Sequence, residues 1–267
     1  MVGARVAAGV LVIIVAACLL APLIAPYHPN QPLDIISQPP SEANRFGTDP
    51  LGRDVLSRVL HGGRVSLGVA LVATLLSIIV GTVFGAVAGY ATGLKAVVLS
   101  RVLDALLSIP RVLLLIAVLA VWRPVPLPVF VIALGATGWY ALARIVRGQV
   151  LALRERDFVV SAEALGASHG RILLRHILPN VVTPIVVAAT LGIGQVIVLE
   201  AGLSYLGIGV PVPNASWGNI IRDSPQNFAA YWWIATFPGL AIVLTVLVFN
   251  VLGDALLRAL QPRQTGI

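Results

Sequence analysis

The sequence predicts an all-α polytopic membrane protein with six transmembrane helices, because apolar residues dominate and recur in six long stretches. Hydrophobic residues make up 58% of the 267 residues, charged residues only 11%, and the mean hydropathy is +0.95. A soluble domain of this length needs far more charge to keep its surface wetted. A helix of about 20 residues crosses a bilayer core of about 30 Å. We expect one domain over 1–267 with spans at about 5–25, 65–92, 97–121, 127–145, 181–202 and 231–257.

The first span contains the single cysteine of the chain. Cys18 follows Val15-Ala16-Ala17, and this stretch is similar to a lipoprotein cleavage site behind a signal peptide. The apolar run continues past Cys18 to Ile24, however, and becomes long enough to cross a bilayer. We therefore expect a transmembrane helix over 5–25 and no intramolecular disulfide.

Residues 26–63 are rich in proline and asparagine and should form an outer loop. One short helix is expected within the loop, because either residue of the Thr48–Asp49 pair can cap it and Gly62 can end it. Asp54 and Arg58 lie one turn apart, so we expect them to pair on the polar face of this helix. The helix would then lie along the membrane surface.

The second span carries a glycine at every fourth position. The row consists of Gly81, Gly85, Gly89 and Gly93. Small residues at this spacing let two helix backbones approach closely in lipid, where packing drives association. The row predicts a helix-contact face and not a nucleotide-binding loop.

The third span is interrupted by polar residues. Pro110 should kink its helix, because proline removes a backbone hydrogen bond and clashes with the preceding turn. Asp104 and Arg111 lie seven residues apart, about two turns, so they should share a face and pair with each other. We interpret this pair as structural, with a role in the pore as the alternative.

The fifth and sixth spans each carry one acidic residue. A charge at the centre of a membrane helix costs about 2.5–3.5 kcal/mol on insertion scales, so each needs a reason to be there. Glu200, near the outer end of the fifth span, either lines a substrate path or holds a gate together by hydrogen bonds to the following loop. We prefer the gate. Asp254 should reach the membrane interface or Arg258, one turn further along the sixth span.

The basic residues predict which side of the membrane each loop occupies. The net charge of +7 arises from 18 basic and 11 acidic residues, and in a membrane protein such an excess records orientation, so no nucleic-acid partner is expected. Placing the N-terminus inside puts eleven basic residues on the inner side and six on the outer side. The inner residues are Arg5, Lys95, Arg101, Arg144, Arg147, Arg154, Arg156, Arg171, Arg175, Arg258 and Arg263; the outer ones are Arg45, Arg53, Arg58, Arg64, Arg123 and Arg222. We expect both termini to be cytoplasmic.

A charged hairpin at 154–180 separates the fourth and fifth spans and falls on the cytoplasmic side. Phe158, Ala162 and Leu165 share a helical face by their i, i+4, i+7 spacing, and Gly166 then turns the chain. Apolar anchors with a charged rim suit insertion into a groove of a soluble protein. The hairpin therefore predicts an aqueous partner.

The second half of the hairpin offers no site for a metal or a nucleotide. Ser168 can cap a second helix, which Pro179 should end. His169 and His176 share a face of that helix but lack a third ligand at suitable spacing, so no metal site is expected. The pattern Gly-x4-Gly-Lys-Ser/Thr is absent, and the only lysine, Lys95, precedes alanine. If the protein uses ATP, another chain must bind it.

The hairpin resembles the cytoplasmic coupling loop of ATP-binding-cassette (ABC) importer permeases, whose pattern is Glu-Ala-Ala, three residues, Gly, and later Ile-x-Leu-Pro. Gly166 matches the family glycine, and Val160-Ser161-Ala162 takes the place of Glu-Ala-Ala, with Glu163 one step beyond. His176-Ile177-Leu178-Pro179 is similar to the variant of the dipeptide, oligopeptide and nickel branch. Valine in place of the first acid leads us to expect an apolar contact led by Phe158, with Glu163 and Gly166 setting the turn.

Further stretches resemble the second permease subunit of that branch. They are Phe46-Gly47-Thr48-Asp49, Leu51-Gly52-Arg53-Asp54, Glu200-Ala201-Gly202-Leu203-Ser204, Ser216-Trp217-Gly218, Phe237-Pro238-Gly239-Leu240-Ala241 and Asn250-Val251-Leu252-Gly253-Asp254. The resemblance implies a type I ABC importer transmembrane fold in a prokaryotic plasma membrane. It also implies three partners: a homologous permease, two ATPase domains that bind ATP and Mg²⁺, and an extracytoplasmic substrate-binding protein. This chain would be no enzyme and would bind no cofactor or metal.

The candidate site residues fall into two groups. Those expected at the ATPase contact are Phe158, Ala162, Glu163, Leu165, Gly166 and Arg171. Those expected along the substrate path or its gate are Glu200, Ser204, Asp104, Arg111 and Asp254. A di- or oligopeptide is the expected substrate, with nickel or a metal chelate as the alternative.

An intramembrane serine protease is a remote alternative, prompted by Gly202-Leu203-Ser204. That chemistry needs a base beside the serine. No histidine follows His176 in the sequence, so the sequence favours the transporter.

Overall fold

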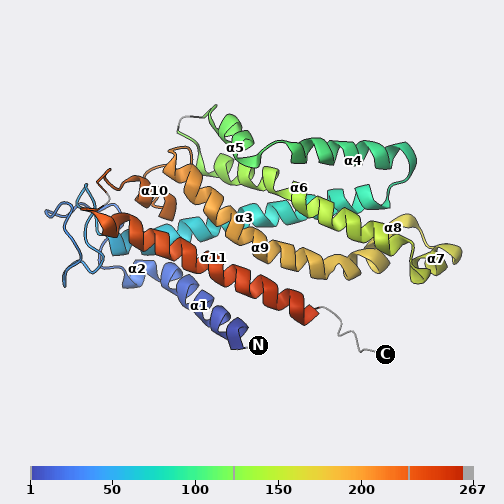
Figure 1. The fold of residues 1–267 in the computed structure, drawn as a ribbon, viewed down its shortest axis with the longest axis horizontal. Coiled ribbons are helices and arrows are strands. Elements are labelled where there is room, and N and C mark those ends of the chain that lie inside the picture. Colours follow the sequence, from blue (N-terminus) through green and yellow to red (C-terminus); the bar gives the residue numbers. More distant parts are fainter. Residues whose placement is uncertain (1, 123, 228, 261–267) are drawn as a thin grey trace.

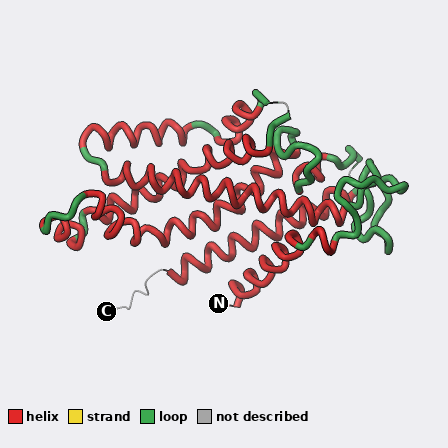
Figure 2. The backbone as a smooth tube through the Cα atoms, turned by 180° about the vertical axis from the view of Figure 1, so that it is seen from behind, coloured by secondary structure: helices red, strands yellow, loops and turns green. Residues whose placement is uncertain are grey.

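The structure is a computed structural model that describes residues 2–122, 124–227 and 229–260. Its long helices run side by side along one axis (Figures 1 and 2). The loop 25–54 and α10 lie at one end of the bundle, and α7 with α8 lies at the other. We call these the loop end and the hairpin end. The start of α1 and the end of α11 both point toward the hairpin end (Figure 1). Arg123 and Arg263, used above to assign orientation, lie outside the described residues.

The helices follow the order expected from the apolar stretches. They are α1 (Val2–Leu19), α2 (Ala21–Ile24), α3 (Val55–Tyr90), α4 (Gly93–Ser108), α5 (Arg111–Leu119), α6 (Leu127–Arg154), α7 (Asp157–Ala164), α8 (His169–Ile172), the π-helix η1 (Leu173–Ile177), α9 (Leu178–Tyr205), α10 (Trp217–Arg222) and α11 (Trp232–Leu260). The predicted all-α membrane fold is confirmed.

The number of spans depends on how broken helices are counted. Within the described ranges, four unbroken helical segments are long and apolar enough to cross a membrane: α3, α6, His169–Tyr205 and α11. The α4–α5 pair makes a fifth candidate, broken by an 80° bend. The first expected span, 5–25, corresponds to the shorter apolar helix Gly3–Leu19. The kink expected at Pro110 is thus confirmed, because the bend falls between Ser108 and Arg111.

Helix α3 corrects the expected surface helix of the outer loop. The chain does not end a helix at Gly62; it starts one at Val55 and continues it for 36 residues. Asp54 caps this helix by accepting a 2.8 Å hydrogen bond from the backbone N–H of Ser57. A Cβ at Gly63 would lie 2.9 Å from the ring of Trp217. The glycines here therefore make room for α10 and do not terminate the helix.

The glycine row of α3 packs against α6. A Cβ built at Gly81, Gly85 or Gly89 would lie 2.9, 2.6 or 2.8 Å from the carbonyl oxygens of Trp139, Ala143 and Arg147, respectively. Such distances require glycine, so the two backbones meet closely along this seam. Gly93 is an exception: it has a φ of +58° at the start of α4, and a Cβ there would meet no atom within 4 Å. It supplies the turn between α3 and α4 and not the expected fourth contact.

The buried apolar residues form two clusters along the bundle. The larger, toward the loop end, includes Leu115, Phe130, Ile197, Trp217 and Ile234. The smaller, toward the hairpin end, includes Val150, Val159, Ile172, Ile177 and Val181. The smaller cluster joins α7 and α8 to the ends of α6 and α9, so the hairpin is packed onto the bundle.

Candidate functional site

The first helix of the hairpin ends in a turn that needs glycine. Gly166 has a φ of +79°, in the left-handed region that other residues rarely adopt. Its N–H donates to the carbonyl of Glu163 at 2.9 Å, and the N–H of Ala167 donates to the carbonyl of Ala162 at 3.1 Å. This pair of bonds is a Schellman motif, which satisfies the last carbonyls of α7. The turn fixes the direction in which α7 meets α8.

The expected coupling residues lie together on the hairpin, but they do not share one environment. Phe158 and Leu165 are 43% and 88% exposed, whereas Ala162 packs partly against the smaller core cluster. Val159, which sequence reasoning did not single out, is buried and anchors α7. Adjacent valines at 159 and 160 gave no periodic signal that could distinguish the anchor from the exposed residue.

The second half of the hairpin is continuous with α9. Ser168 caps α8 as expected, accepting a 3.4 Å hydrogen bond from the N–H of Arg171. The expected stop at Pro179 is wrong. The π-helix η1 (Leu173–Ile177) leads directly into α9. Pro179 occupies the first turn of α9, where its missing N–H is tolerated. The hydroxyl of Tyr90, at the end of α3, also lies 3.0 Å from Nδ1 of His169.

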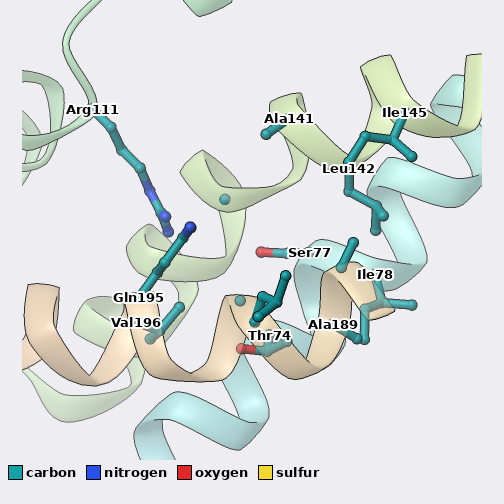
Figure 3. Close-up of a pocket in the computed structure, with 14 residues that line it drawn as sticks. Thr74, Ser77, Ile78, Arg111, Ala141, Leu142, Ile145, Ala189, Gln195 and Val196 are labelled. Carbon is teal, nitrogen blue, oxygen red and sulfur yellow. The ribbon is translucent and has the colours of Figure 1, made fainter. Parts of the chain in front are cut away.

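Arg111 lies beside a cavity near the middle of the bundle. The cavity has a volume of about 190 Å³ and is formed by side chains of α3, α5, α6 and α9 (Figure 3). Nε of Arg111 donates to Oγ1 of Thr137 at 3.2 Å, and Nη2 donates to the carbonyl of Leu134 at 2.7 Å. Both acceptors are on α6. The guanidinium group is therefore held in place across the cavity wall.

The expected pair between Asp104 and Arg111 is wrong. The 80° bend between α4 and α5 separates the two residues, so helical spacing no longer places them on one face. Asp104 instead accepts a 2.6 Å hydrogen bond from Nη2 of Arg144 on α6. The Asp104 and Arg144 side chains are 51% and 59% exposed. Asp254, near the end of α11, is exposed, and the described residues show no ion pair between it and Arg258.

Glu200 is fully buried in a hydrogen-bonded cluster toward the loop end. Its Oε1 accepts from the hydroxyl of Ser204 at 2.7 Å, and its Oε2 accepts from the hydroxyl of Ser66 at 2.8 Å. Each serine in turn accepts a backbone N–H, from Val210 at 3.1 Å and from Trp217 at 3.2 Å. We call Glu200, Ser66 and Ser204 the carboxylate clasp. It ties α3 and α9 to the following loop and to α10, and it does not line the central cavity.

Ser204 is also the serine of the protease alternative. Its hydroxyl is buried, donates to Glu200 and accepts from the N–H of Val210. Both roles hold the backbone together, and neither leaves the oxygen free to attack a substrate. The geometry favours a structural role for this serine.

A second polar cluster joins the loop 25–54 to the segment after α10. Asp49 Oδ2 accepts from Arg53 Nε at 2.7 Å and from Arg58 Nη1 at 2.6 Å. Asp223 Oδ2 accepts from Nη2 of both arginines at 2.9 Å. Arg58 therefore pairs with Asp49 and Asp223 and not with Asp54, which caps α3. Sequence spacing could not reveal this cluster, because Asp223 is 165 residues from Arg58.

Comparison with known proteins gives consistent matches over nearly the whole chain. The family described as "Binding-protein-dependent transport system inner membrane component" matches residues 81–266, and "N-terminal TM domain of oligopeptide transport permease C" matches residues 3–40. The putative peptide transport system permease protein of Brucella suis biovar 1 (strain 1330) is 42% identical over 97% of this chain and 87% of its own length. The oligopeptide transport system permease protein OppC of Bacillus subtilis (strain 168) is 38% identical over 95% of this chain and 83% of its own length.

A solved structure shares the fold. The match is a chain in the structure titled "Inward facing conformations of the MetNI methionine ABC transporter", with a TM-score of 0.60 and 20% sequence identity. It covers 76% of this chain and 96% of the other chain. The helical fold of this chain is therefore the one found in that ABC transporter chain, in line with the fold expected from the sequence.

Proposed function

Because the chain belongs to the family of inner membrane components of binding-protein-dependent transport systems, we propose that it is a pore-forming permease subunit of an ATP-driven importer for di- or oligopeptides. The observation that carries the substrate class is the match, over 95% or more of this chain, to relatives named for peptides. The chain is a transport subunit, and in our proposal the ATP and Mg²⁺ are bound by its partners.

The two ends of the bundle suit two different partners. We propose that the exposed side chains of Phe158 and Leu165 on α7 contact an ABC ATPase domain, with Glu163 and Arg171 at the rim of the contact. The opposite, loop end would receive a substrate-binding protein. A homologous permease would complete the pore. In this proposal both termini would be cytoplasmic and the protein would lie in the prokaryotic plasma membrane.

The packing of the hairpin suggests how ATP hydrolysis drives transport. Closure of the two ATPase domains would displace α7, which is anchored to the bundle through the buried Val159. Since α8 leads into α9 without a break, the displacement would tilt α9 against α3 and α6. A bundle with two packed arrangements can thereby alternate between access from outside and access from inside.

Reconstitution tests the proposed function directly. The chain is co-expressed with a partner permease, the ATPase subunits and a substrate-binding protein from the same organism, and the purified complex is placed in vesicles with ATP on the ATPase side. We expect ATP-dependent uptake of labelled di- and tripeptides, lost when this chain is omitted. Uptake of labelled nickel without peptide uptake would replace our proposal with the metal importer.

A further inference from the structure

The central cavity contains one charged side chain among few polar ones. Arg111 reaches it from α5, Thr74 and Ser77 from α3, and Gln195 from α9 (Figure 3). The remaining lining residues are glycine, alanine, isoleucine, leucine and valine. No acidic residue within the described ranges lines the cavity, so it carries a positive charge in an otherwise uncharged setting.

The guanidinium of Arg111 is held in one orientation by two hydrogen bonds, but several of its N–H groups have no acceptor among the described residues. Nη1 donates no hydrogen bond to any residue that the structure describes, and Nη2 has a second N–H beyond the one given to Leu134. A Cβ at Gly138 would lie 2.9 Å from Nη2, so glycine leaves the space in which the guanidinium lies. Figure 3 shows the side chain of Gln195 pointing toward the same group. Nη1 and the second N–H of Nη2 therefore remain available as donors.

Thr74 supplies a second unused polar group. Its side chain is buried, at 4% exposure, and its Oγ1 has no hydrogen-bond partner in the described part of the chain. A buried hydroxyl without a partner is unfavourable, so such groups usually have a ligand or a water. Thr74 lines the cavity on the α3 side. Thr74 therefore lines the cavity with its hydroxyl oxygen enclosed, and the hydroxyl meets a ligand there when the side chain turns, whereas the guanidinium of Arg111 already has N–H groups to spare.

Arg111 lines two neighbouring hollows, which is the position expected of a residue along a substrate path. A second hollow, of about 500 Å³, is lined by Arg111 and Gln195 together with Asn250 of α11. Arg111 and Gln195 therefore stand at the boundary between two neighbouring cavities. A group that moves from one cavity to the other passes this pair.

We propose that Arg111 and Thr74 form a transit site for the terminal carboxylate of the peptide, a role that rests on the proposed peptide import. A planar guanidinium binds a carboxylate through two parallel hydrogen bonds, and Arg111 has an unused N–H on both Nη1 and Nη2. The terminal carboxylate is common to all unmodified peptides, so this contact does not depend on peptide sequence. Release onward is possible because one such contact binds weakly enough for a substrate to leave.

Uptake of a matched peptide pair tests the site. The reconstituted complex is given one tripeptide as the free acid and as the C-terminal amide, and each variant is compared with the unmodified complex for both. We expect Arg111→Gln to lower uptake of the free acid at least about tenfold, the size of one charge-assisted hydrogen bond. Uptake of the amide should change less than about twofold. Thr74→Val, which keeps the side-chain shape, should lower free-acid uptake several-fold.

Arg144→Gln is the matched control, because it also removes an arginine from the span region but leaves the cavity lining intact. It should alter uptake of the acid and of the amide by the same factor. If Arg111→Gln also lowers both by the same factor, Arg111 has only a structural role and the proposal is overturned. Basal ATPase activity of each complex shows that it is assembled.

Charge-selective labelling gives a readout that does not need peptide transport. Gln195→Cys places a thiol beside the guanidinium. The native Cys18 is buried, so the labelling rate of the unmodified chain gives the background to be subtracted. We expect an anionic methanethiosulfonate reagent to label the new thiol several times faster than a cationic one, and Arg111→Gln to remove this preference. Equal rates with Arg111 in place would refute an anion-attracting site. If the complex imports no peptide yet labels selectively, only the substrate assignment fails.

Discussion

The carboxylate of Glu200 in α9 accepts a 2.8 Å hydrogen bond from the hydroxyl of Ser66 in α3, 134 residues earlier in the chain. Both side chains are buried, and Ser66 passes the connection on to the backbone of Trp217. An acid that first drew attention as a candidate for the substrate path thus lies inside a joint between helices. Burying a carboxylate is unfavourable, and it is tolerated here because both oxygens of Glu200 accept hydrogen bonds.

Removing the carboxylate should loosen the loop end. Glu200→Ala leaves the hydroxyls of Ser66 and Ser204 without their acceptor, and each unpaired buried group costs about 1–3 kcal/mol. We expect a lower thermal unfolding temperature of the detergent-purified complex and faster proteolysis after α10. Glu200→Gln, which retains an acceptor oxygen, should lose less. Equal stability of Glu200→Ala and the unmodified protein would contradict the clasp.

The glycine seam between α3 and α6 should tolerate no side chain at its centre. A Cβ at Gly85 would lie 2.6 Å from the carbonyl oxygen of Ala143, so Gly85→Ala must push two helices apart, at about 1–3 kcal/mol. Gly68→Ala is the control on the same helix, because a Cβ there meets no atom within 4 Å. We expect Gly68→Ala to be neutral or stabilising by up to about 1 kcal/mol. Thermal unfolding in detergent compares the two, and a similar loss in both would show that the seam is not tight.

Changing the glycine of the hairpin should separate ATP hydrolysis from transport. Gly166→Val forces a β-branched residue into a φ of +79° and disturbs the Schellman turn that orients α7. We expect peptide uptake to fall at least about tenfold while ATPase activity persists, which parallel assays on the same vesicles would detect. Gly170→Ala in the neighbouring α8 has open space and serves as the control. Coupled uptake that survives Gly166→Val unchanged would rule out this role.

The buried ion pair between Arg58 and Asp49 should contribute more to the free energy of unfolding than an exposed ion pair. Arg58→Ala leaves the fully buried carboxylate of Asp49 with a single cationic partner, and breaking such a pair costs about 3–5 kcal/mol. Glu155→Ala removes an exposed pair with Arg154 and should cost less than about 1 kcal/mol. Chemical denaturation of the purified complex gives both values. Similar values for the two variants would show that Arg58 contributes little.

The long membrane helices were predictable because each has a local signature in the sequence, whereas the short helix α10 and the early start of α3 at Val55 were not expected. Long apolar stretches locate α3, α6, α9 and α11, and the four-residue spacing of Gly81, Gly85 and Gly89 identifies the seam. Ser168 and Gly166 were recognisable because capping and left-handed turns depend on single residues. These features need no knowledge of distant contacts.

The errors arose where local spacing was carried across a break or where the partner lies far along the chain. Asp104 and Arg111 share a face only if the helix continues through Pro110, and it does not. The pairing of Arg58 with Asp223 spans 165 residues, so no periodic pattern reports it. Pro179 was expected to stop a helix, but its position in the first turn of α9 makes it compatible with one. The sequence therefore identified the important polar residues but not the residues with which they pair.

The helical continuity from His169 to Tyr205 has a mechanical consequence. At about 1.5 Å per residue, this 37-residue segment extends for about 55 Å, from near the tip of the hairpin to the carboxylate clasp, to which it contributes Glu200 and Ser204. The π-helix Leu173–Ile177 and Pro184 are the points at which this segment can bend, and a push at the hairpin would swing the part of α9 beyond them. The force need not be relayed through a chain of side-chain rearrangements, and the part that swings carries Gln195, which lines the central cavity.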